Sequence, residues 1–169
     1  MNDEVLKFLR SLRAVREYTP EPVSDADLQA ILEVGRWTAT GGNRQQHEVV
    51  VVRDPEVRAK FAEWGAKPAG AGQVALLIVS AGDANAFDEG RIAERLALAA
   101  KAVGLGSCIA TLKNEGPDQA KALLGIPAEA RARTLVSVGH ADVEARKALP
   151  KAGPSARKPL AEFARIDHY

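Results

Sequence analysis

The chain of 169 residues contains one cysteine, a nearly balanced charge and no long apolar run. Cys108 has no partner for an internal disulfide, and with three scattered histidines it offers no metal-ligand spacing, which excludes a disulfide scaffold and a structural zinc site. The net charge of +1 removes any bulk electrostatic reason to expect nucleic acid or an anionic membrane as partner. The longest apolar stretch, residues 74–79, is too short to span a bilayer, and without a secretory signal we expect a cytoplasmic protein.

Aromatic residues are scarce at 5%, although 46% of the residues are hydrophobic and alanine is abundant. Small side chains favour close helix packing, and the length predicts a single domain over residues 1–169. Apolar periodicity disappears after His140, and Ala145–Pro159 is rich in proline and basic residues. We therefore expect residues 140–169 to form an extended C-terminal arm.

Apolar spacing along the rest of the chain predicts a mixture of helices and strands. Ser24 and Asp27 form a capping-box signature for a helix that ends near Trp37. Residues 88–103 form a helix that is apolar around most of its circumference, and the run within Gln73–Ala81 predicts a buried, central strand. The other predicted elements are the strands Glu48–Arg53, Cys108–Leu112 and Arg133–Val138 and the helices Glu56–Trp64 and Pro117–Leu124.

Two segments resemble common catalytic or cofactor-binding motifs, but the elements predicted around them do not fit those motifs. Gly70, Gly72 and Ala75 have the spacing of a dinucleotide-binding loop, but they precede a strand instead of opening a helix, so we interpret the glycines as a turn. The acidic pair Asp88 and Glu89 is better explained as solvated charge at a helix start than as glycosidase chemistry. The sequence thus favours neither a Rossmann domain nor a hydrolase.

Two short polar segments could bind a ligand. Arg13 and Arg16 stand three residues apart at the end of the first helical pattern, where both could fork onto one phosphate, although solvated surface arginines are the alternative. The loop 38–46 offers backbone and amide groups to a flat polar ligand, and a simple capping turn is its alternative interpretation.

Both segments, and others in order along the chain, resemble the FMN-dependent nitroreductase family. Arg13–Tyr18 is similar to its Arg-Ser-x-Arg-x-aromatic signature, with Ala14 in the place of serine. Residues 38–47 resemble its Ala-Pro-Ser-x-x-Asn-x-Gln-Pro-Trp loop, although Gln46 and His47 replace the last two residues. The other similar segments are Glu21–Val23, Val49–Glu56, Glu89–Cys108 and Arg157–Leu160.

The resemblance implies an α+β fold with a mostly antiparallel central sheet flanked by helices. It implies an intertwined homodimer, in which the arm of residues 140–169 wraps the partner subunit. It also implies FMN as cofactor, NAD(P)H as co-substrate and a ping-pong, two-electron reduction of a nitroaromatic, a quinone or a similar acceptor. Other flavin chemistry on this fold (dehydrogenase, dehalogenase or deazaflavin-linked) and a non-catalytic flavin-binding protein are the alternatives.

The resemblance also assigns contacts residue by residue. Three arginines would hold the FMN phosphate, and residues 38–43 of the other subunit would line the flavin ring. Backbone groups after Cys108 would lie near the N5 edge of the ring. We expect no essential catalytic side chain and no metal, because the cofactor carries the redox chemistry. His47 is a candidate substrate contact, with a structural role at the start of a strand as the alternative, and Lys67 is a candidate for a further flavin contact. Cys108 is expected to be a small buried residue. The expected cofactor-binding residues are Arg13, Ala14, Arg16, Ala39, Thr40, Gly41, Asn43, Ala110, Thr111 and Arg157.

Overall fold

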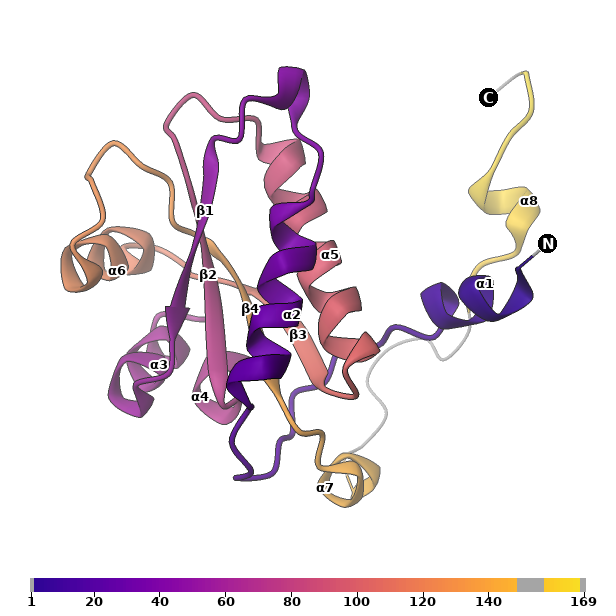
Figure 1. The fold of residues 1–169 in the computed structure, drawn as a ribbon, viewed down its shortest axis with the longest axis horizontal. Helices are drawn as coiled ribbons and strands as arrows, with labels where there is room; N and C mark the ends of the chain where they lie inside the picture. The colour runs from indigo at the N-terminus through magenta and orange to yellow at the C-terminus, as the bar shows by residue number, and fades with distance from the viewer. Residues whose placement is uncertain (1, 149–156, 168–169) are drawn as a thin grey trace.

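The computed structural model describes residues 2–148 and 157–167 and has a four-stranded sheet between two layers of helices (Figure 1). The spatial order is β1-β2-β4-β3, and all neighbouring strands are antiparallel, which confirms the expected α+β class. The strands are β1 (His47–Val52), β2 (Val74–Ser80), β3 (Gly106–Thr111) and β4 (Thr134–Gly139).

Helices cover both faces of this sheet. One face carries α2 (Asp25–Arg36) and α5 (Ala86–Ala102). The other face carries α3 (Pro55–Glu63), α4 (Pro68–Ala71) and α6 (Gly116–Leu124). The boundaries of α2, α3, α5 and α6 lie within about two residues of those expected from the apolar spacing, whereas α4 was not expected.

The central position of β2 is confirmed, because β1 and β4 flank it and every one of its residues is buried. Its alternate side chains enter two different cores. Leu76 and Ile78 pack with α2 and α5, whereas Leu77 packs with Phe61 of α3. A strand buried on both faces needs an uninterrupted apolar run, which is how the sequence revealed it.

The pairing of α2 with α5 requires a small residue at one point. A Cβ on Gly35 would lie 2.6 Å from the Leu96 Cδ2 atom, so the two helices approach closely only where α2 has no side chain. The start of α2 confirms its predicted cap, since the Ser24 side chain accepts a hydrogen bond from the Asp27 N–H at 3.1 Å.

The prediction that Arg13 and Arg16 share a helix is wrong. The first helix, α1 (Asp3–Arg10), ends before them, and Ala14 instead forms a parallel bridge with Ser107 of β3. Val15 is buried directly over Gly106, where a Cβ would lie 2.8 Å from its Cγ1 atom. The burial of Val15 and the pairing with the edge of β3 stabilise the extended conformation more than the local helical preference stabilises a helix.

The glycines before β2 also differ from their interpretation as a turn. Gly70 lies within the one-turn helix α4, and Gly72 follows it with its Cα packed against the Ser137 side chain. They still precede a strand, so the exclusion of a dinucleotide-binding loop stands.

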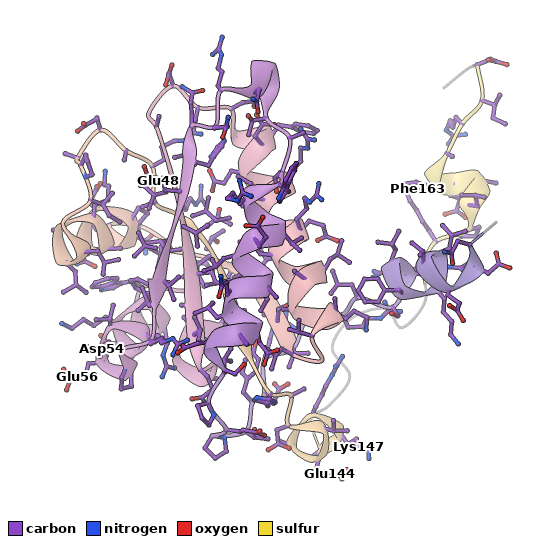
Figure 2. The ribbon with its side chains drawn as sticks, in the orientation of Figure 1. Glu48, Asp54, Glu56, Glu144, Lys147 and Phe163 are labelled. Carbon is purple, nitrogen blue, oxygen red and sulfur yellow. The ribbon has the colours of Figure 1, made fainter. Side chains whose placement is uncertain are left out.

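The C-terminal segment is less extended than expected, because two short helices form in it. They are α7 (Val143–Ala148), which carries the Glu144–Lys147 ion pair seen in Figure 2, and α8 (Leu160–Phe163). Asp142 starts α7 by accepting a hydrogen bond from the Ala145 N–H at 2.8 Å. Residues 149–156, 168 and 169 of the expected arm lie outside the described residues, and its wrapping of a partner stays a prediction.

The two terminal helices leave apolar side chains uncovered. Both project to the same side of the sheet domain in Figure 1, and α1 buries none of its residues. Leu9 is 47% exposed and Phe163, labelled in Figure 2, is 74% exposed. No helix within the described ranges is long and apolar enough to cross a membrane.

Candidate functional site

A cavity of about 680 Å³ lies between the segment after α1, the first half of β3 and the middle of α5. Arg13, Ala14, Arg16 and Arg157, all expected at one site, line it together. Residues from opposite ends of the sequence therefore meet in one place. A fourth cation, Arg10, also lines the cavity and was missed, because nothing in its local sequence distinguishes it from a surface arginine on α1.

The extended conformation of residues 13–16 decides which side chains face the cavity. Side chains alternate along an extended segment, so Val15 enters the core while Ala14 and Arg16 are exposed. The Val15 N–H donates to the Ser107 carbonyl oxygen at 2.8 Å and holds the segment against β3. The Arg13 guanidinium folds back and donates to the Arg10 carbonyl oxygen at 2.7 Å, which places it above the end of α1.

The cavity is strongly cationic. Among the described residues, its lining contains four guanidinium groups and a single carboxylate, Glu94 of α5. Within residues 2–148 and 157–167, none of these four arginines forms a salt bridge. Unpaired guanidinium groups around a cavity create a site for an anion, above all for phosphate, whose oxygens match their planar donors. In the same part of the chain, no group of three or more acidic, histidine or cysteine side chains could hold a metal ion.

The strand β3 continues from the cavity toward the predicted residues Ala110 and Thr111. Ile109 lines the cavity, and these two half-buried residues follow it directly. In the described sheet β3 is an edge strand, and the bridge to Ala14 occupies its outer side only at Ser107. Backbone groups on the outer side of its second half are therefore available to a ligand.

The loop 38–46, which joins α2 to β1 at the top of Figure 1, lies apart from the cavity. Of the residues described, none from this loop lines the cavity, so Ala39, Thr40, Gly41 and Asn43 do not join the arginines within one chain. The loop contacts α5 at Asp88, whereas the cavity contacts Glu94, which is roughly 9 Å further along the helix at 1.5 Å per residue.

Asp88 was expected to be a solvated acid at a helix start, and that interpretation is wrong. Its side chain is only 6% exposed, and its Oδ2 atom accepts a hydrogen bond from the Gly41 N–H at 2.9 Å. This hydrogen bond, more than the neighbouring Arg91, lowers the pKa of the Asp88 carboxyl. No local signal could have shown this contact, because the two residues are 47 positions apart.

A smaller cavity of about 360 Å³ lies beneath the loop and is lined by Thr38, Thr40 and His47, among others. The His47 Nδ1 atom is 2.8 Å from the Ser80 hydroxyl, which supports a structural role for this ring. Burial lowers the pKa of His47 below its ordinary value of 6.5 and favours the neutral ring. The Nε2 atom of His47 and the hydroxyl of Thr38 are buried without a partner among the described residues.

The two remaining candidates are simpler. Cys108 is buried, as expected, and burial raises the pKa of its thiol, which makes it a poor nucleophile. Lys67 is exposed at the start of α4. Cys108 lines the arginine cavity, whereas Lys67 is not among the described residues that line it.

Comparison with known proteins agrees with this geometry. The sequence profile of the nitroreductase family matches residues 9–90. A putative NADH dehydrogenase/NAD(P)H nitroreductase from Archaeoglobus fulgidus is 29% identical over 151 residues, which cover 82% of this chain and 86% of the relative. An NADPH-flavin oxidoreductase from Vibrio harveyi is 27% identical over 163 residues, covering 84% and 67%.

Solved structures show the same architecture. A putative nitroreductase from Desulfovibrio desulfuricans, in complex with FMN, superposes with a TM-score of 0.76 at 27% identity over 100% of this chain and 99% of that chain. An FMN-dependent nitroreductase from Clostridium difficile gives a TM-score of 0.82 at 21% identity, covering 97% and 99%. The architecture is thus that of the nitroreductase fold. The chain is similar to the nitroreductase family in sequence and has its fold.

Proposed function

We propose that this protein is an NAD(P)H-dependent flavin oxidoreductase that binds FMN and passes two electrons to a nitroaromatic, a quinone or a similar acceptor. The observation that carries the proposal is the convergence of Arg13, Arg16 and Arg157 on one cavity. The names of the relatives, an NAD(P)H nitroreductase and an NADPH-flavin oxidoreductase, and the FMN complex of a similar structure support it.

The residues of the cavity fit an FMN phosphate. A phosphate monoester carries close to two negative charges near neutral pH, and the guanidinium groups of Arg13, Arg16 and Arg157 could offset them. Ala14 cannot donate a hydroxyl hydrogen bond, so only its backbone N–H is available there. The outer edge of β3 at Ala110 and Thr111 would then offer backbone groups to the ring system.

Bound FMN would supply the redox chemistry, and the residues of this chain would bind and orient it. A backbone N–H at Ala110 or Thr111 is a fixed dipole, which stabilises negative charge near it without any proton transfer. We therefore expect no essential acid or base among the side chains. One cavity would serve NAD(P)H and the acceptor in turn, which gives ping-pong kinetics.

We further propose that the site is completed by a second copy of the chain. The loop 38–46 lies apart from the arginine cavity of its own chain, so its residues Ala39, Thr40, Gly41 and Asn43 would reach the flavin ring of the partner subunit. Uncovered apolar side chains on α1 and α8, such as Leu9 and Phe163, support a homodimer because their burial would stabilise it.

The test is the flavin spectrum of the purified protein. FMN is added, excess is removed by gel filtration, and the retained visible absorbance is measured. We expect close to one FMN per chain, followed by bleaching on anaerobic titration with NADH or NADPH and recovery of the oxidised spectrum with a nitroaromatic or quinone. A protein that retains no flavin overturns the proposal, and one that retains flavin but is reduced by neither nicotinamide overturns the NAD(P)H-dependent activity.

A further inference from the structure

The loop 38–46 has an irregular backbone with several left-handed residues. Three of its residues have left-handed φ angles: Gly42 at 59°, Asn43 at 52° and Gln45 at 51°. Glycine and asparagine adopt this conformation most readily, whereas the Cβ of Gln45 disfavours it there. The loop has hydrogen bonds of its own, such as that from the Gln45 N–H to the Thr40 Oγ1 atom at 3.1 Å, and its two ends are held by contacts with the rest of the fold.

Those contacts come from one place, the connection between β2 and α5 together with the first turn of α5. The Asp88 Oδ2 atom accepts from the Gly41 N–H at 2.9 Å and holds the start of the loop. The Gln46 side chain donates to Asp83 at 2.9 Å, and the Ala81 N–H donates to the Gln46 carbonyl oxygen at 3.0 Å, which hold its end. Both ends of the loop are thus tied to a short stretch of chain.

Asp88 is well suited to this task. It stands in the first turn of α5, where the positive end of the helix dipole stabilises a carboxylate, and its side chain is nearly excluded from water. Its second oxygen, Oδ1, accepts from Arg91 at 3.2 Å. The carboxylate therefore has donors on both oxygens, and a hydrogen bond to an ionised acceptor is stronger than one to a neutral acceptor.

We propose that Asp88 is a positioning residue, whose hydrogen bond to the Gly41 N–H holds the loop in the shape that lets Thr40 and Asn43 meet the flavin ring. The inference rests on the proposed function, because the flavin is what the loop would meet. It adds a residue that touches neither cofactor nor substrate and acts through the backbone of the loop.

Because each oxygen of Asp88 has a different partner, substitutions can separate two effects on the loop. One is the hydrogen bond to Gly41, and the other is the negative charge of the carboxylate. Asp88→Asn keeps one acceptor oxygen and places an NH₂ group where the second oxygen was. Arg91, which is 40% exposed, can turn to solvent, so the remaining oxygen can stay on Gly41. Asp88→Ala removes both acceptors. Arg91→Met removes the ion pair together with the contact between Arg91 and the Phe87 ring and leaves the Asp88 carboxylate in place. Glu89→Gln is the matched control for loss of charge at the same helix start.

The first measurement is amide hydrogen exchange in residues 39–46 of the purified protein before flavin is added. We expect Asp88→Ala to speed exchange in this segment by at least about tenfold, as the loss of a charge-assisted hydrogen bond implies, with a smaller change in Asp88→Asn. Arg91→Met and Glu89→Gln should exchange as the wild type does. If residues 39–46 of Asp88→Ala exchange at the wild-type rate, the proposal is overturned. If Asp88→Ala fails to fold, the other two variants decide. Wild-type exchange in Asp88→Asn combined with faster exchange in Arg91→Met then overturns the proposal.

The second measurement is the visible circular dichroism of bound FMN together with its dissociation constant. Asp88→Ala should alter the dichroism and weaken FMN binding by on the order of tenfold, whereas Glu89→Gln should change neither. A loosened loop with wild-type dichroism and affinity overturns the positioning role, because the contact would then be structural only. Failure of the wild type to bind FMN overturns the proposed function instead, and the exchange data still report on the Asp88 contact.

Discussion

The backbone N–H of Val15 donates to the carbonyl oxygen of Ser107 at 2.8 Å and joins the segment after α1 to the edge of β3. This single register places Ala14 and Arg16 on the cavity side and Val15 in the core. The position of Arg16 in the cationic cavity therefore depends on strand pairing and not on a helix face.

The guanidinium of Arg16 is expected to contribute directly to FMN affinity. Arg16→Ala should weaken FMN binding on the order of 10- to 100-fold, the range for a charged hydrogen bond. Fluorescence titration at two salt concentrations is the measurement, and raised salt should weaken wild-type binding more than variant binding. Lys60→Ala, which removes an exposed cation from α3 on the other face of the sheet, is the control. Equal affinity of Arg16→Ala and wild type would remove Arg16 from the site.

The contact between Gly106 and Val15 should appear as energetic coupling. A Cβ at position 106 would lie 2.8 Å from the Val15 Cγ1 atom, so Gly106→Ala should lower the free energy of unfolding by about 1 to 3 kcal/mol. The double variant Gly106→Ala with Val15→Ala should be more stable than the sum of the two single changes allows. Urea unfolding of the four proteins measures this, and strict additivity would contradict the packing described.

The uncovered face of α1 is expected to be part of a subunit interface. Val5 and Leu6 are 49% and 40% exposed, so replacing both by Asp should leave the folded subunit intact while shifting the dimer toward monomer. Light scattering after size-exclusion chromatography measures the mass. Leu123→Asp, at a residue of α6 that is also 40% exposed, is the control and should keep the wild-type mass. A wild type that is monomeric at all concentrations would contradict the homodimer.

Stability should depend on pH through His47. Burial lowers the pKa of this ring in the folded state below 6.5, so the unfolded chain binds the proton more tightly. The stabilisation is present above pH 6.5 and is lost as the pH falls from there through the folded-state pKa. His47→Gln should show a flatter dependence in thermal unfolding between about pH 7 and pH 5 than the wild type. His140→Gln is the control, and equal slopes in wild type and His47→Gln would refute this assignment.

Local signals predicted most of the secondary structure correctly. The Ser24 cap, the apolar run of β2 and the proline after Asp54 each act within a few residues, and Asp54 does cap α3 by accepting from the Glu56 N–H at 2.8 Å. Figure 2 labels Asp54 and Glu56 at this helix start. Such signals are readable because their energies depend on neighbours in the chain.

The errors occurred where distant parts of the chain compete with local preference. The helical spacing of Arg13 and Arg16 lost to pairing with Ser107, which is more than 90 residues away. The local sequence predicts a solvated acid at Asp88, whereas in the fold Asp88 accepts a hydrogen bond from the distant Gly41. The sequence of one segment does not reveal how strong its contacts with distant segments are.

The sequence by itself determined the four strands, the helices α2, α3, α5 and α6, the buried central strand and the basic residues near both ends of the chain. Only the tertiary structure decided that Arg10, Arg13, Arg16 and Arg157 surround one cavity and that Asp88 accepts a hydrogen bond from Gly41 of the loop 38–46, which lies apart from that cavity. The physical reason is that the energies of helix caps and of apolar periodicity depend on residues close together in the sequence. A cationic cavity and a buried hydrogen bond exist only after the sheet has fixed which distant residues meet.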